Sequence, residues 1–367
     1  MNLQERLAPK IEIINQEIQQ LVGSWDLVDP LIKAIHHILK SGGKRMRPML
    51  TLLSCEAVGG DVNSVMKPAI SIELIHNASL LWDDVLDEDD LRRGRITVHK
   101  KWNKNTAILA GGTLASKALE LISNKPDILD LYLKSIGKMI EGQVLDVSSS
   151  LNATTQLFKS KSEKEIFEIL RKRFRERAIE GMEWEESKDL LLLADFTDFE
   201  EERDYFEMIS YKTSALIKLA TRIGAILGGG TQGEIEALTN YGFYLGLAFQ
   251  VRDDLIGLIS DEKTLGKPIG SDLRQGKFKL NLYTIFALRN LDDENLREFL
   301  KLMQKIEQGD AFQKIRKIID DCGAINYTRD KIQLIVQKAR DHLSLLNDSD
   351  SKAVLNDLIT FTIERKF

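Results

Sequence analysis

The 367-residue chain carries 51 basic and 56 acidic side chains, a formal net charge of −5, and 43% of its residues are hydrophobic. This balance disfavours nucleic-acid binding, because neutralising phosphates needs a strong excess of Lys and Arg on one face. The two cysteines, Cys55 and Cys322, cannot build a disulfide framework, and the first residues lack the apolar block of a signal peptide. No apolar run approaches the roughly 20 residues of a membrane span. We therefore expect a soluble cytoplasmic protein with no nucleic-acid partner and no membrane span.

Helical periodicity dominates the chain. Apolar residues recur three and four positions apart over residues 69–78, and again from 216 to 227, whereas alternation of period two is rare. Turn signals stand at residues 41–43, 59–61, 111–112 and 228–230. The last of these precedes Thr231-x-x-Glu234, a capping box that starts a helix. The pattern predicts an all-α fold of ten or more helices.

One segment, at about residues 150–200, differs in character from the rest. It is basic over residues 159–177 and becomes acidic over residues 180–204, and Ser162-x-x-Glu165 can cap a helix at its start. A pair of solvated helices with complementary charge is the simplest interpretation. A lid, a subunit contact and a membrane-surface contact are also compatible with this pattern, and the sequence does not choose between them.

The strongest local signal is the acidic run at residues 83–90, which ends an apolar helix. Asp83 and Asp87 are four residues apart and share a helix face, with Asp84 beside them. Like charges repel at this spacing, so the cluster indicates a bound cation, and oxygen ligands favour magnesium. Arg92 and Arg93 follow at once and suit bidentate phosphate contacts. The competing interpretation is an acidic helix end that is merely solvated.

Two further polar blocks favour the bound cation over the solvated helix end. Asp253-Asp254 again ends an apolar helical run and leads into a Gly- and Lys-containing segment, residues 266–277. Gly42-Gly43-Lys44-Arg45-Met46-Arg47, early in the chain, supplies cations for another phosphate group. Together the blocks predict a cavity that binds more than one phosphorylated substrate with metal ions.

Six ordered motifs carry a resemblance to a known family: GGKRMRP, ELIHNASLLWDDVLDEDDLRRG, EGQVLD, YKTSALI, GLAFQVRDDL and LGKPIGSDLRQGK. The chain resembles the trans-isoprenyl diphosphate (polyprenyl) synthases, and is similar to those that make geranylgeranyl and longer-chain products. The resemblance implies one all-α domain over residues 1–367, an isoprenoid synthase helical bundle with a central catalytic cavity. The segment at about 150–200 is then a charged helical insertion.

The resemblance implies that isopentenyl diphosphate condenses head to tail with an allylic diphosphate, with Mg²⁺ as cofactor in a homodimer. It places metal-binding carboxylates in both acidic clusters, and it gives His76 a substrate role rather than a core one. Gln143 is implied to lie near the metal, with Asp146 on the same helical face. The implied metal ligands are Asp83, Asp84, Asp87, Asp253 and Asp254; the groups facing the reacting allyl are Lys212, Thr213 and Gln250; and the diphosphate-binding groups are Lys44, Arg47, His76, Arg92, Arg93, Lys267 and Lys277.

Ionisation of the allylic C–O bond needs electrostatic stabilisation of the leaving diphosphate, which magnesium and Lys or Arg groups supply in a site poor in water. Ala78 and Ser79, one turn before the first acidic motif, are implied to form the floor beneath the growing chain. Both are small, so the resemblance implies a C20 or longer product.

The sequence departs from the family pattern at three positions. Gly257 stands where a third Asp usually completes the second acidic motif, Trp82 replaces a common His, and Gly112 replaces an acidic residue. These changes leave open a non-catalytic or regulatory subunit of a heteromeric synthase. A terpene cyclase and a helical scaffold with solvated acidic patches stay open as well. The retained cationic residues favour an active synthase.

Overall fold

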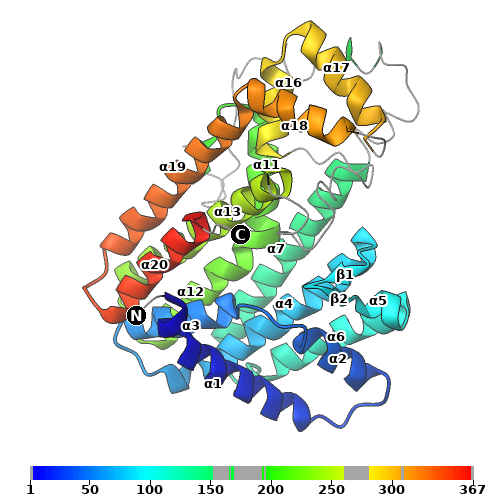
Figure 1. Cartoon of the computed structure of the whole chain (residues 1–367). Helices are drawn as coiled ribbons and strands as arrows, with labels where there is room; N and C mark the ends of the chain where they lie inside the picture. The colour runs from blue at the N-terminus through cyan, green and yellow to red at the C-terminus, as the bar shows by residue number, and fades with distance from the viewer. Residues whose placement is uncertain are drawn as a thin grey trace. The chain divides into compact units, whose positions relative to one another are not determined.

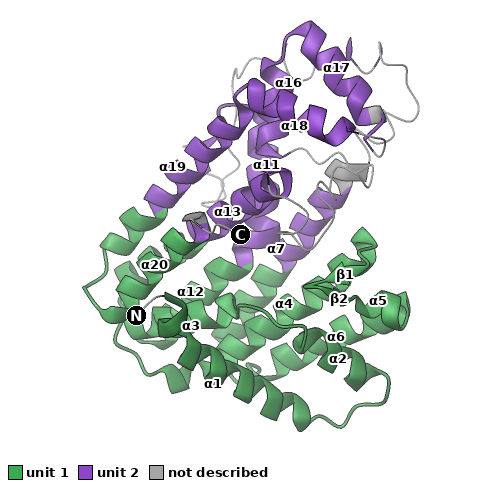
Figure 2. Ribbon diagram, viewed as in Figure 1, with its two compact units in different colours: residues 1–136, 216–243, 339–361 green, residues 137–215, 244–338, 362–367 purple. Residues whose placement is uncertain are grey.

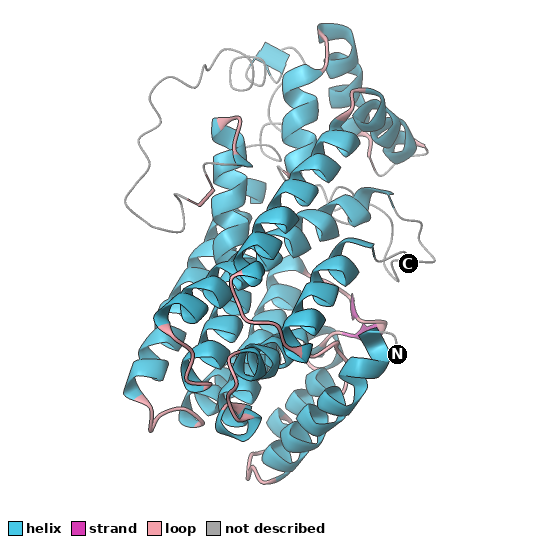
Figure 3. Ribbon diagram, turned by 90° about the vertical axis from the view of Figure 1, so that its left-hand side faces the viewer, coloured by secondary structure: helices cyan, strands magenta, loops and turns pink. Residues whose placement is uncertain are grey.

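The computed structural model describes residues 3–151, 165, 167–168, 192–193, 196–259, 281–306 and 310–364. Helices make up most of the described chain, and its strands have two residues each (Figures 1 and 3), which confirms the all-α prediction. The elements are α1 (Leu3–Gly23), α2 (Leu31–Leu39), α3 (Met46–Ala57), η1 (Val62–Ser64), α4 (Met66–Asp87), β1 (Leu91–Arg92), β2 (Arg95–Ile96), α5 (Val98–Lys101), α6 (Lys104–Glu120), α7 (Pro126–Leu151), α11 (Glu200–Ile209), η3 (Ser210–Ser214), α12 (Ala215–Leu227), α13 (Gln232–Ile259), α16 (Leu282–Asn290), α17 (Asp293–Gln304), α18 (Ala311–Asp321), α19 (Ala324–Ser344) and α20 (Asp350–Glu364).

The chain divides into two compact units (Figure 2). Unit 1 comprises residues 1–136, 216–243 and 339–361, and unit 2 comprises residues 137–215, 244–338 and 362–367. Because the division follows contacts and not independent folding, the single domain stays a prediction. In the described part of the chain, no helix combines the length and apolar character needed to cross a bilayer.

Helix α4 is the centre of unit 1. It packs against α3 on one side and lies beside α6 on another (Figure 1), and α1, α2 and α5 also contact it. Neighbours on several sides explain why this helix buries apolar side chains around most of its circumference, including Ile72, Leu74 and Leu81. The acidic run therefore sits at the end of a helix that the core holds firmly.

Unit 2 has an aromatic core. The ring of Phe196 lies edge-on to that of Tyr244, with centroids 5.7 Å apart, and tilted against Phe206 at 6.3 Å. Beside it, the hydroxyl of Tyr327 lies 2.5 Å from the carboxylate of the fully buried Glu202 and 2.8 Å from that of the exposed Asp198. These contacts hold α11 against α19.

Two local predictions are confirmed and one is wrong. The capping box forms at the start of α13, since the backbone N–H of Thr231 donates to the Glu234 carboxylate at 2.8 Å. The glycine signals at 41–43, 59–61 and 228–230 fall between helices. Gly111 and Gly112, predicted as a turn, lie inside α6 instead.

Gly111 is a packing glycine. A Cβ at this position would lie 2.4 Å from Nε1 of Trp82, so only glycine lets the indole rest on α6. The indole N–H donates to the carbonyl oxygen of Ile108 at 3.4 Å. A close approach between helices gives the same sequence signal as a turn, which is why the prediction failed.

A small hairpin was missed because its strands have two residues each. β1 pairs antiparallel with β2, with Arg92 opposite Arg95. Arg93 and Gly94 form the turn with positive φ angles of 54° and 73°, as a two-residue hairpin loop requires. The hairpin follows the acidic end of α4 directly, so it positions Arg92 and Arg93 beside that end. The insertion at about 150–200 lies largely outside the described residues.

Candidate functional site

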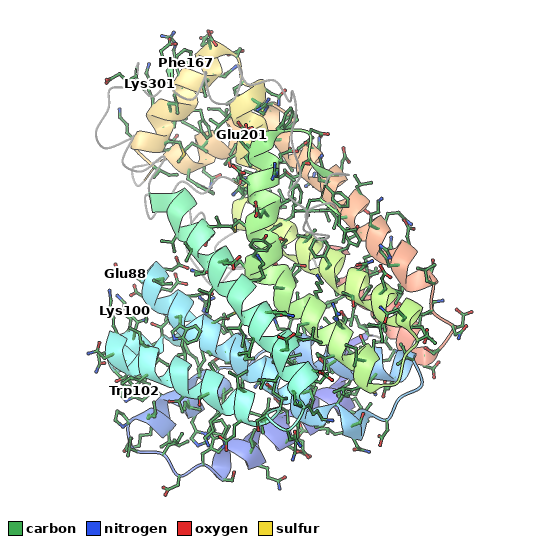
Figure 4. All side chains as sticks on the ribbon, turned by 180° about the vertical axis from the view of Figure 1, so that it is seen from behind. Glu88, Lys100, Trp102, Phe167, Glu201 and Lys301 are labelled. Atoms are coloured by element: carbon green, nitrogen blue, oxygen red, sulfur yellow. The ribbon has the colours of Figure 1, made fainter. Side chains whose placement is uncertain are left out.

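The acidic end of α4 divides its carboxylates between two environments. The helix ends at Asp87, and Glu88, labelled in Figure 4, marks that end with a left-handed φ of 57°. Asp83 and Asp87 are half-buried and share a face, whereas Asp84 is only 1% exposed. Neighbouring residues point about 100° apart on a helix, so the adjacent pair cannot face the same way.

Asp84 is ion-paired with Arg92. The guanidinium approaches Asp84 Oδ1 with Nη2 at 2.6 Å and Nε at 2.7 Å, and Nη2 also reaches Asp89 at 3.1 Å. Burial lowers the pKa of Arg92, but the Asp84 carboxylate outweighs this and leaves that pKa above its usual value. Arg92 is thus fixed beside the acidic cluster, and Asp84 as a metal ligand stays a prediction.

The turn of the hairpin meets the glycine loop between α2 and α3. Arg93 Nη1 donates to the carbonyl oxygen of Gly42. Gly43, with φ of 151°, lies against the end of the Arg93 side chain: a Cβ would lie 2.8 Å from Arg93 Nη1 and would displace the guanidinium. The turn of the hairpin, 51 residues after Gly42, therefore lies against the loop that carries Lys44 and Arg47.

A cluster of cationic side chains surrounds His76 within unit 1. Burial lowers the pKa of His76 well below its usual value, and Arg47, Arg93, Arg92 and Arg45 lower it further. Burial also lowers the pKa of Arg47 to about 10, which Arg93 reinforces and Glu73 opposes. Nε of Arg47 is buried and has no hydrogen-bond partner within the described ranges. Crowded positive charge with spare donors is the chemistry of a diphosphate site.

Arg45 and Glu73 lie under this cluster; the sequence grouped Arg45 with the cations expected to bind phosphate, and it assigned Glu73 no role. They form a buried ion pair at 2.8 Å, with side chains 6% and 3% exposed. Arg45 adopts a left-handed φ of 49° and also donates to Asn15 Oδ1 and to the carbonyl oxygen of Leu39, both at 2.9 Å. The pair fixes the loop that carries Lys44 and Arg47. A carboxylate on an apolar helix, three residues before His76, was the available signal.

Lys44 and the proposed chain-length floor also lie in unit 1. Lys44 is exposed, with Nζ 6.0 Å from the ring centroid of Phe361. Ala78 is fully buried, and the hydroxyl of half-buried Ser79 donates to the carbonyl oxygen of His76 at 2.8 Å. Their assignment as a floor stays a prediction.

Unit 2 brings together Asp146 and Lys212, from α7 and η3. Their charged atoms are 2.5 Å apart, and the Asp146 side chain is 5% exposed. Lys212 lies in a single turn of π-helix, a feature common at functional sites. Gly142 allows the close approach, and buried Nε2 of Gln143 has no hydrogen-bond partner in the part of the chain that the structure describes.

A hydrogen-bonded chain links three helical segments of unit 2. The hydroxyl of Thr213 donates to Gln250 Oε1 at 2.6 Å, and Gln250 Nε2 donates to Asp254 Oδ1 at 2.8 Å. The hydroxyl of Tyr205 donates to the other oxygen, Asp254 Oδ2, at 2.7 Å. Thr213 and Gln250, predicted together from separate motifs, are in direct contact. Tyr205 was not predicted.

Asp253 faces outward, unlike its neighbour. Its side chain is 44% exposed, and its carboxylate lies 3.7 Å from Nη1 of Arg252. Loss of hydration beside the surrounding protein raises the pKa of Asp253 to about 6, and the charge of Arg252 opposes that rise. In each acidic motif, the second aspartate accepts hydrogen bonds from protein side chains: Asp84 from Arg92, and Asp254 from Gln250 and Tyr205.

The donor set fits magnesium. The candidate ligands are carboxylate oxygens, and magnesium commonly takes one or two carboxylates together with water and substrate phosphates. Such a site needs no group of three ligating side chains, and the described ranges contain none. Lys267 and Lys277 lie outside the described residues. The two acidic motifs belong to different units, so their convergence on one leaving group stays a prediction.

Known proteins resemble the chain over nearly its whole length. It is 34% identical to the "Short chain isoprenyl diphosphate synthase" of Methanothermobacter thermautotrophicus, covering 100% of this chain and 99% of the relative. The geranylgeranyl pyrophosphate synthetase of Pyrococcus horikoshii matches in structure with a TM-score of 0.78 and 33% identity, over 99% and 98% of the two chains. The polyprenyl synthase of Caulobacter crescentus, solved with calcium and isoprenyl diphosphate, matches with a TM-score of 0.78 and 26% identity, over 99% and 97%.

These neighbours confirm the isoprenoid synthase helical bundle. The family match covers residues 28–174 and 156–321. The chain belongs to the polyprenyl synthetase family.

Proposed function

We propose that this chain is a prenyltransferase that joins an allylic diphosphate to isopentenyl diphosphate, head to tail and trans, giving a C20 or longer polyprenyl diphosphate. One observation carries the proposal. A cluster of cationic groups around His76 and an acidic helix end occur in the same unit, joined by the Arg92–Asp84 ion pair. Two diphosphates, one bound by cationic side chains and one through metal ions, need these two kinds of site.

Isopentenyl diphosphate binds to the cationic cluster. Lys44, Arg47, His76 and Arg93 supply its diphosphate contacts, and the spare Nε donor of Arg47 supports this assignment. His76 is neutral there, with one donor and one acceptor nitrogen, because burial and the surrounding arginines keep its pKa low. The Arg45–Glu73 pair keeps the loop in place before the substrate arrives.

The allylic diphosphate binds at the acidic end of α4. Asp83 and Asp87 would hold magnesium there, and Arg92 would contact the diphosphate directly. Asp253, in the second acidic motif, would hold a further ion. Bound magnesium supplies positive charge that stabilises the diphosphate as it leaves. Lys267 and Lys277 add to that stabilisation.

The oxygens of Thr213 and Gln250 and the backbone of Lys212 face the allyl group as its positive charge develops. The double bond of isopentenyl diphosphate attacks this cation, and the released diphosphate accepts the proton that is then lost. No nucleophilic side chain is needed. Ala78 and Ser79 leave space beneath the growing chain, which supports a product of C20 or more.

The chain acts as a homodimer in the cytoplasm. Exposed apolar side chains on unit 1 support association: Ile108 and Leu109 on α6 are 48% and 65% exposed, and Leu133 on α7 is 51% exposed. Single exposed apolar residues are ordinary, but three on two consecutive helices are consistent with a subunit contact. The two described free cysteines are consistent with a reducing compartment.

Incubation with labelled isopentenyl diphosphate, magnesium and each allylic primer from C5 to C20 tests the proposal. We expect product from at least one primer, with chain length read by thin-layer chromatography. Asp83→Ala is expected to reduce turnover at least about 100-fold with the fold intact, and Asp330→Ala, at an exposed position of α19, is the matched control. Absence of product with every primer, or near-normal activity of Asp83→Ala, would reject it.

A further inference from the structure

The hydrogen-bonded chain of unit 2 has a direction, and its anchor is Asp254. This carboxylate accepts from Gln250 at one oxygen and from Tyr205 at the other, so its hydrogen-bonding partners fix its plane. Ionised carboxylates only accept, whereas an amide has an accepting end and a donating end. Gln250 must therefore turn its NH₂ toward Asp254.

The orientation of Gln250 then determines that of Thr213. With its NH₂ on Asp254, Gln250 presents Oε1 to Thr213, whose hydroxyl donates its only hydrogen to that oxygen at 2.6 Å. The two hydrogen bonds do not use the lone pairs of Thr213 Oγ1 or the second lone pair of Gln250 Oε1, so these lone pairs can face a neighbouring group. The reverse orientation would set Gln250 Oε1 against the Asp254 carboxylate at 2.8 Å, two acceptors in contact.

The consequence is electrostatic. Oxygen lone pairs stabilise an adjacent carbocation, and N–H or O–H hydrogens destabilise it. A flipped Gln250 would donate to Thr213, and the Thr213 hydrogen would then be turned outward. Dipoles fixed before reaction cost no reorganisation when the positive charge forms.

Tyr205 completes the anchor. It lies on α11, is 3% exposed, and reaches Asp254 from the side opposite Gln250 in the hydrogen-bond chain. Burial, followed by the neighbouring Asp254, raises the pKa of Tyr205 well above its usual value, so its hydroxyl remains a donor. Asp253, the adjacent carboxylate, is 44% exposed and takes no part.

We propose that Tyr205 is a positioning residue: acting through Asp254, it sets the orientation of the Gln250 amide so that the oxygens of Gln250 and Thr213 face the reacting allyl group. This rests on the proposed function, which places the allyl group beside Gln250. The inference also gives the two aspartates of the second acidic motif different roles: Asp253 would bind metal, whereas Asp254 orients Gln250.

A double-mutant cycle tests the inference. Tyr205→Phe keeps the ring and removes the donor, and Gln250→Leu keeps the approximate size and removes the amide. We expect Tyr205→Phe to lower kcat about tenfold while KM for isopentenyl diphosphate stays within twofold. In the Gln250→Leu background, Tyr205→Phe should lower kcat by less than twofold, because there is no amide left to orient.

Tyr241→Phe is the matched control, since it removes another buried hydroxyl whose partner is the carbonyl oxygen of Leu355. Its kcat should stay within twofold of the wild type. Equal losses of kcat from Tyr205→Phe in both backgrounds would overturn the inference, as would a selective rise in KM for isopentenyl diphosphate.

The same cycle, read by unfolding in urea with a chelator and without substrate, separates this inference from the proposed function. Coupling between positions 205 and 250 in unfolding supports the chain even if the wild type makes no product, an outcome that rejects the function alone. Additive effects on unfolding would overturn the inference whatever the activity.

Discussion

Gly142 offers a sharp test of how the Lys212 site is built. A Cβ at residue 142 would lie 2.3 Å from the backbone N of Lys212 and 2.8 Å from its Cα. Non-bonded carbons rest about 3.5–4.0 Å apart, and backbone atoms cannot rotate away as a side chain can. In Gly142→Ala, α7 and the π-helical turn must therefore separate by roughly 1 Å.

Gly137, one and a half turns earlier on α7, is the control, because a Cβ there meets no described residue within 4 Å. Both substitutions gain about 1 kcal/mol of helix propensity. Only Gly142→Ala also overpacks its site, which costs about 1–3 kcal/mol. The propensity gain cancels in the comparison, so Gly142→Ala should be less stable than Gly137→Ala by about 1–3 kcal/mol.

The displacement should also affect the site. It moves Lys212 relative to Asp146, whose charged atoms are now 2.5 Å apart. Because a misplacement of about 1 Å can lower turnover as much as about 100-fold, we expect at least a tenfold loss of kcat in Gly142→Ala and none in Gly137→Ala. Urea unfolding and steady-state prenyl transfer are the assays. Equal stability and equal kcat in the two variants would refute the reasoning.

Three further predictions concern the metal, the pH dependence and the product. Among the described residues, nothing lies within 4 Å of a Cβ at Gly257. Gly257→Asp should therefore fit and lower the magnesium concentration at half-maximal activity severalfold, whereas Gly257→Asn should not lower it. Equal magnesium dependence of the two variants would argue against a metal near Asp253. Burial and nearby arginines depress the pKa of His76, so the unfolded chain gains a proton below about pH 6.5 that the folded chain does not. As the pH drops from 6.5 to 5, the melting temperature of the wild type should therefore fall more steeply than that of His76→Gln. Equal falls of the two melting temperatures would contradict a depressed pKa. Ala78→Phe should shorten the product on thin-layer chromatography while the melting temperature shows the fold intact, and an unchanged chain length would remove Ala78 from the floor.

Much of this protein could be predicted from the order of its residues. Apolar residues three and four positions apart predicted the helices, and the capping box at Thr231 forms as expected. The resemblance to the polyprenyl synthases grouped Arg47 and Arg93 with His76, and Thr213 with Gln250, and these residues lie close to one another in the structure, while their roles stay predictions. The wrong prediction, a turn at Gly111, arose because a close helix contact and a turn both select glycine.

The sequence alone determined that each acidic motif lies on a helix and that its two adjacent aspartates point about 100° apart. Which aspartate turns inward was decided by the elements that pack there: a hairpin brings Arg92 to Asp84, and α11 brings Tyr205 to Asp254. Helical periodicity fixes relative directions along one segment, whereas the partner of a buried charge comes from residues distant in the chain. The ion pair of Arg45 with Glu73, 28 residues apart, has the same origin.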